Sequence, residues 1–82
     1  MRYETIENKL KEQNSKAILI DGFDEALIGI TQNKNPFVGV YDLEKCMAIL
    51  IESGMTLEES NEYIKSKLEE YKSEHDPIFI SL

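Results

Sequence analysis

The chain has 82 residues, of which 41% are hydrophobic and 30% are charged, and this length and composition predict one globular domain of residues 1–82. Sixteen acidic residues against nine basic ones give a formal net charge of −7, so we expect direct binding neither to nucleic acid nor to an anionic membrane. The single cysteine, Cys46, excludes an intramolecular disulfide, and with no secretory signal or long apolar run it predicts a soluble cytoplasmic protein.

The first predicted element is an amphipathic helix from Tyr3 to about Glu12. Tyr3, Ile6 and Leu10 recur at helical spacing, while the charged residues between them face the solvent. The polar pair at 14–15 favours a turn and is expected to end this helix.

Three strands are predicted to follow. The apolar run Ala17–Ile20 is too short for a helix and predicts a strand that is buried on both faces or nearly so. Asp21–Gly22 breaks that strand, and Glu25–Thr31 and Phe37–Tyr41 are predicted as the next two. The polar segment Gln32–Pro36 between them favours a turn, so we expect these two strands to form a hairpin.

The clearest helix is predicted to begin after Asp42 and to end at Gly54. The Asp42 carboxylate can accept hydrogen bonds from the first backbone N–H groups of the helix, and Gly54 tolerates the left-handed conformation common at helix ends. The apolar face of this helix consists of Leu43, Cys46, Met47, Leu50 and Ile51.

A second long helix is predicted to begin at the capping-box pair Thr56 and Glu59. Its apolar stripe consists of Leu57, Ile64, Leu68 and Tyr71. Because this stripe is thin, the helix should lie at the edge of the core. Pro77 prevents the helix from continuing, and the branched and aromatic side chains of Ile78–Leu82 predict a closing strand.

This order of elements, α-β-β-β-α-α-β, predicts an α+β fold. Helices should cover one face of a three- to four-stranded antiparallel or mixed sheet. The last strand is expected either beside the first strand or at an edge, where it could pair with another chain. The pattern therefore leaves a homodimer open.

Three carboxylates, Asp21, Asp24 and Glu25, are a candidate metal or catalytic site. They are too close in sequence to converge on one cation without a dedicated calcium loop, and the sequence has no such loop. Asp21–Gly22 is instead predicted to form a turn, and Asp24 to cap or bond local backbone N–H groups. We expect no metal and no cofactor, and these three residues remain secondary candidates for a binding surface.

Cys46 and His75, with Asp42 or Asp76, are the residue types from which a nucleophile, a base and an orienting group could be built. Cys46 occupies a core position of its helix, where burial disfavours the reactive thiolate. His75 lies in a polar turn before the last strand. We therefore predict that the protein is not an enzyme, although an uncharacterised Cys/His enzyme remains an alternative.

The second long helix also carries the strongest candidate for a binding surface. We predict that an acidic face supplies charge complementarity to a protein partner with a basic surface, with Tyr63 as an aromatic anchor. The predicted contact residues are Glu58, Glu59, Glu62, Tyr63, Glu69 and Glu70. An alternative is an oligomer that sequesters a nucleotide-like signal, which would need Arg2, Lys16 or Lys34 gathered at one site.

Four segments together resemble a family of small, largely uncharacterised proteins encoded by phages and prophages. These segments are Asp21–Ala26, Val40–Asp42 with Lys45–Cys46, Gly54–Glu59 with Glu62–Tyr63, and Glu74–Phe79. The resemblance implies an α+β domain without assigned enzymatic activity. It also implies a phage accessory role in the host cytoplasm, such as an inhibitor of a host defence protein, of which anti-CRISPR proteins are one kind. The sequence departs from the family pattern after Tyr63, along Ile64–Glu70.

Overall fold

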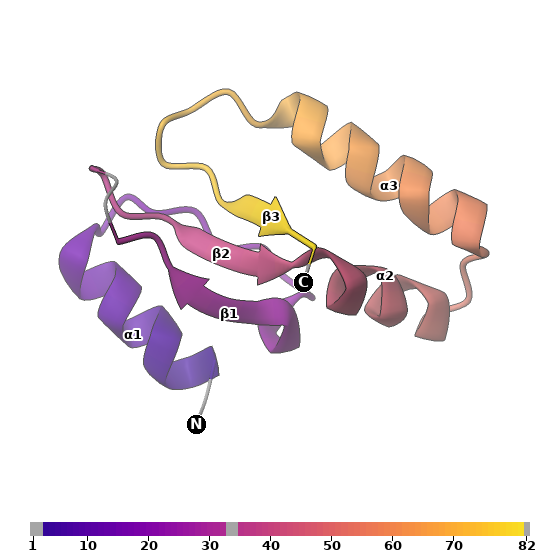
Figure 1. Ribbon diagram of the computed structural model, residues 1–82, viewed down its shortest axis with the longest axis horizontal. Coiled ribbons are helices and arrows are strands. Elements are labelled where there is room, and N and C mark those ends of the chain that lie inside the picture. Colours follow the sequence, from indigo (N-terminus) through magenta and orange to yellow (C-terminus); the bar gives the residue numbers. More distant parts are fainter. Residues whose placement is uncertain (1–2, 33–34, 82) are drawn as a thin grey trace.

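The computed structural model describes residues 3–32 and 35–81, and it shows a small α+β fold (Figure 1). In chain order the elements are α1 (Tyr3–Gln13), the 3-10 turn η1 (Asp24–Ala26), β1 (Leu27–Ile30), β2 (Gly39–Asp42), α2 (Leu43–Glu52), α3 (Leu57–Glu70) and β3 (Ile78–Ile80). The predicted fold class is confirmed. The Tyr3 side chain and Leu82, which were included in predicted elements, lie outside this description.

The sheet is mixed and has three strands in the order β1-β2-β3. β1 and β2 are antiparallel, which confirms the predicted hairpin, while β3 runs parallel to β2 with Tyr41 opposite Phe79. The strands are shorter than predicted, and β2 extends one residue further, to Asp42. β3 lies at the edge, as one of the two predicted arrangements required, and its pairing with another chain stays a prediction.

The predicted strand Ala17–Ile20 is wrong. This segment is an extended connection whose backbone donors bond outside any sheet ladder: the Ile18 N–H donates to the His75 carbonyl and the Ile20 N–H to the Tyr41 hydroxyl. Ala17 and Ile20 are buried, but Ile18 is 38% exposed. The apolar run therefore reflects the burial of Ala17 and Ile20, and the element order has one strand fewer than predicted.

The strand predicted from Glu25 begins two residues later, at Leu27. Residues Asp24–Ala26 instead form a 3-10 turn, in which the Ala26 N–H donates to the Phe23 carbonyl at 2.9 Å. This tight turn allows Phe23 and Ala26 both to be buried, at 3% and 0% exposure. An extended strand would have sent alternate side chains to opposite faces.

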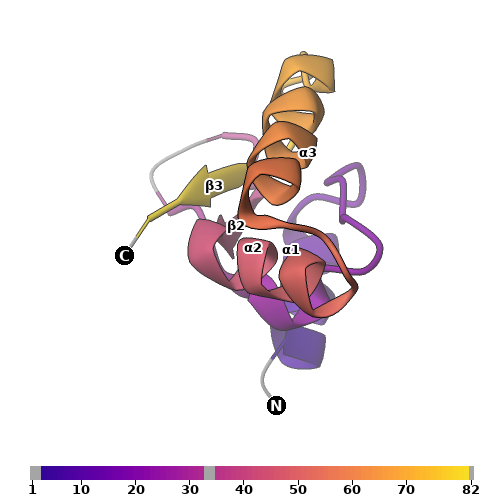
Figure 2. The same cartoon turned by 90° about the vertical axis from the view of Figure 1, so that its right-hand side faces the viewer.

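The core lies on the face of the sheet that meets the helices. A Cβ placed on Gly39 would approach Leu27 of β1 at 3.1 Å and Leu10 of α1 at 3.4 Å, so α1 packs closely against this face. Tyr41 shares the central cluster with Cys46 and other buried residues from α2 and α3. No helix crosses in front of the strands in Figure 1, and Figure 2 shows β3 at the margin of the molecule with α3 beside it.

The predicted helix boundaries are confirmed by their capping interactions. The Asp42 carboxylate accepts from the N–H of Glu44 at 3.0 Å and of Lys45 at 3.4 Å, and Gly54 has a φ of +115°. Thr56 and Glu59 form a complete capping box at the start of α3. Each of these interactions is local in sequence, which is why the pattern predicted them.

The predicted apolar faces are correct only in part. Cys46, Leu50 and Ile64 are buried, but Ile51 is 43%, Leu57 59% and Leu68 46% exposed. α3 instead turns the fully buried Ser60 inward, because the Ser60 hydroxyl donates to the Leu57 carbonyl at 2.8 Å and needs no partner across the core. In the described part of the chain, every helix is too short or too polar to span a membrane.

Candidate functional site

Five exposed glutamates follow two stripes along α3. Glu58, Glu62 and Glu69 are separated by four and seven residues and share one stripe. Glu59 and Glu70 share the second stripe with Tyr63 at the same spacings. Both stripes lie away from the buried residues Ser60 and Ile64. We call this surface the acidic face, and it comprises Glu58, Glu59, Glu62, Tyr63, Glu69 and Glu70.

Most carboxylates of the acidic face have no partner among the residues that the structure describes. Glu59 is the exception, since its Oε1 accepts from the Thr56 N–H at 2.9 Å. The other four form no hydrogen bond or ion pair with a described residue. Glu58 and Glu62 are one helical turn apart, where like charges repel by a few tenths of a kcal/mol. The arrangement therefore presents negative charge outward.

Tyr63 lies at the border between the core and the acidic face, as predicted. The residue is 37% exposed, and its ring makes an edge-to-face contact with Phe23 at 6.4 Å between centroids. The ammonium group of Lys67 lies 5.6 Å from the centre of the same ring. Packing thus fixes one edge of the ring and leaves part of it accessible, which is the geometry required of an aromatic anchor.

The structure separates the three secondary candidates. Asp21 and Gly22 form the predicted turn, with Gly22 at a φ of +90°. Asp24 opens η1, and the predicted bond from its carboxylate to local backbone N–H groups is absent among the described residues. Between Asp21 and Asp24, Phe23 makes a ring contact with Tyr63, while η1 packs against α1 and α2. Glu25 instead borders a hollow against Lys45 on α2.

Within residues 3–32 and 35–81, no three His, Cys, Asp or Glu side chains are placed to hold a metal ion.

Cys46 and His75 occupy different surroundings. Cys46 is fully buried in the central cluster, and burial followed by the nearby Asp42 carboxylate raises the pKa of its thiol to about 12. His75 Nδ1 lies 3.0 Å from Asn14 Nδ2, and its Nε2 lies 3.8 Å from a Glu74 carboxylate oxygen. Asp42 caps α2, and Asp76 accepts from the Ser73 N–H at 2.6 Å. The predicted core position of Cys46 and the turn position of His75 are therefore confirmed, whereas the close polar partner of the imidazole is Asn14, from the end of α1.

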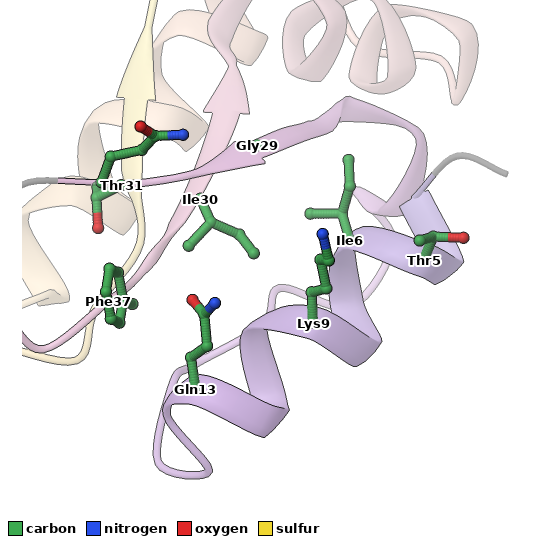
Figure 3. A pocket seen from close by; sticks show the side chains of 9 residues that line it. Thr5, Ile6, Lys9, Gln13, Gly29, Ile30, Thr31 and Phe37 are labelled. Carbon is green, nitrogen blue, oxygen red and sulfur yellow. The ribbon is translucent and has the colours of Figure 1, made fainter.

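A groove that the sequence did not predict lies between α1 and β1 (Figure 3). It has a volume of about 480 Å³, within the range of ligand-binding pockets. Lys9 is its one cation among the described residues. No local pattern in the sequence predicted it, because it depends on where α1 lies beside β1. Of the basic residues proposed for a nucleotide site, Lys16 is exposed, while Arg2 and Lys34 lie outside the described residues.

Comparisons with protein-family models, with curated proteins and with solved structures found no match. The resemblance to phage-encoded proteins therefore stays a prediction.

Proposed function

We propose that the protein is a non-enzymatic binding protein, and that its acidic face holds a basic surface of a partner protein. Four carboxylates that have no partner among the described residues supply the charge, and Tyr63, packed against Phe23, supplies the anchor. Asp21 and Asp24 remain secondary candidates for the interface.

The observation that supports this proposal most strongly is that the carboxylates of Glu62, Glu69 and Glu70 form no hydrogen bond or ion pair with a described residue. Stability alone favours carboxylates that cap a helix start or pair with lysine, as Glu59 does at Thr56. Glu69 and Glu70 are in the last turn of α3, where the helix dipole disfavours negative charge. A basic partner would offset both the dipole and the mutual repulsion.

The resemblance to phage proteins adds a biological setting to the proposal. An inhibitor of a host defence protein that handles nucleic acid needs to occupy a basic groove, and carboxylates at helical spacing can take the place of phosphates there. We therefore propose a host defence protein as the partner.

Affinity capture from a lysate of the bacterial host, followed by mass spectrometry, tests the proposal. Three baits are compared: the wild-type chain, Glu62→Lys with Glu69→Lys on the acidic face, and Glu12→Lys with Glu52→Lys as a control. Both variants have the same net charge, and Glu12 and Glu52 are exposed near the ends of α1 and α2. A basic protein should be retained by the wild type and the control and lost from the acidic-face variant. Equal retention by all three baits would contradict the proposal.

A further inference from the structure

The groove between α1 and β1 is apolar at its floor and open along one side. Ile6, Ile30 and Phe37 line it, and Figure 3 shows Ile6 directed from α1 toward the strand and Ile30 directed from the strand toward α1. Lys9 and Gln13 stand on the helix side of the groove. The side chains therefore form a channel that runs beside the strand.

One wall of this channel is an unpaired strand edge. β1 pairs with β2 on one side and is the outer strand of the sheet on the other. The Thr31 N–H donates inward, to the Val38 carbonyl at 3.0 Å. Because the hydrogen-bonding direction alternates along a strand, the N–H and C=O of Ile30 point outward, toward the free edge. An exposed edge of this kind is a template for another extended chain.

Gly29 leaves part of the groove wall without a side chain. Its φ is not in the left-handed region, since among the described glycines only Gly22 and Gly54 have positive φ. A Cβ at Gly29 would meet no atom within 4 Å, so packing within the chain does not require glycine either. The register between β1 and β2 shifts between Leu27 and Gly29, and a glycine inside a strand often marks such an irregularity.

The charge of the groove is opposite to that of the molecule. The net charge of the chain is −7, yet none of the nine residues that line the groove is acidic. Lys9 forms no ion pair with a described residue. The groove thus combines apolar contacts, free backbone hydrogen-bonding groups and one unpaired cation.

We propose that this groove binds an extended peptide segment of a partner protein, which adds to the edge of β1 as a fourth strand. Alternate apolar side chains of the segment pack on Ile6, Ile30 and Phe37. A carboxylate of the segment lies at Lys9. This site is separate from the acidic face on α3, so a test that contradicts the peptide site leaves the proposed role of the acidic face unaffected, and the reverse also holds.

The site is tested by selecting random dodecapeptides from a display library on the intact chain. The selected peptides should share alternating apolar positions with at least one Asp or Glu. Lys9→Glu with Gln13→Glu should weaken binding by about tenfold or more, because both changes place negative charge beside the peptide carboxylate. Lys65→Glu with Ser66→Glu on α3 changes the net charge equally and should leave the affinity unchanged. The acidic-face variant should also bind normally.

N-methylated peptides test strand addition without altering the protein. Methylation of alternate backbone nitrogens, those that face β1, should abolish binding, whereas methylation of the intervening nitrogens should not. The proposal is overturned if the selection enriches no peptide family, or if peptides with the two methylation patterns bind the chain equally. It is also overturned if Lys9→Glu with Gln13→Glu binds the peptides as tightly as Lys65→Glu with Ser66→Glu. If sedimentation shows a dimer, and if Lys9→Glu with Gln13→Glu disrupts that dimer, the groove binds a second copy of the chain. If octanoate binds and peptides do not, the groove binds a small acid. Either result also overturns the proposal.

Discussion

Two buried side chains with ionisable groups define the centre of the core. Tyr41 and Cys46 are 1% and 0% exposed, and burial raises the pKa of each to about 12. The position of Cys46 was predicted from helical spacing. The contact of Tyr41 with Ile20 was not predictable, because it joins residues that are 21 positions apart in the sequence.

The raised pKa values predict a loss of stability at alkaline pH. Above pH 9 the unfolded thiol loses its proton while the folded thiol keeps it, so the unfolded state binds fewer protons and is favoured as pH rises. The free energy of unfolding should fall by up to about 1.4 kcal/mol per pH unit for each such group. In Cys46→Ala the decline should be shallower between pH 9 and pH 10. Urea unfolding across this range measures it, and equal slopes for the two chains would show that the thiol is not shielded.

Tyr41→Phe should lower the free energy of unfolding by about 1–3 kcal/mol, because the buried Ile20 N–H would lose its acceptor. The ring contact between Tyr41 and Phe79, at 5.8 Å between centroids, would remain. Urea denaturation at neutral pH measures the difference. A variant as stable as the wild type would mean that the 3.0 Å bond from Ile20 contributes nothing.

At the scale of elements, the sequence predicted the features that depend on local interactions, but not those that depend on tertiary contacts. Asp42, Gly54 and the Thr56–Glu59 pair act on backbone groups within a few residues, so the limits of α2 and α3 followed from them. The run Ala17–Ile20 has the composition of a strand, but its backbone bonds reach Tyr41 and His75 instead of a neighbouring strand. Only the packed structure determines that choice.

On α3, Glu62→Gln should separate binding from stability. Glu62 is one turn from Glu58 and Glu59 on one side and from Lys65 on the other, so neutralising it removes repulsion and attraction of similar size. The free energy of unfolding should change by no more than about 0.5 kcal/mol. The same variant should bind the captured partner more weakly. Chemical denaturation and calorimetric titration on one preparation measure the two effects. A clear loss of stability would assign Glu62 a structural role.

At the scale of the whole molecule, two candidate binding surfaces lie on different elements. Helical periodicity alone predicted the acidic face, because the glutamates of α3 fall opposite its buried residues. It could not predict that Phe23 contacts Tyr63 at the border of this face, or that Glu25 borders a hollow on α2, because both depend on tertiary packing. The groove depends on the placement of α1 beside an edge strand, and no local sequence pattern predicts that placement.

The affinity of the captured partner for the chain, measured over a range of salt concentrations, tests the central proposal most directly. Affinity for the wild type should fall as salt rises, and at low salt Glu62→Lys with Glu69→Lys should bind at least about tenfold more weakly than the control Glu12→Lys with Glu52→Lys. Equal affinities of these two variants, with no dependence on salt, would contradict a role for the acidic face in binding.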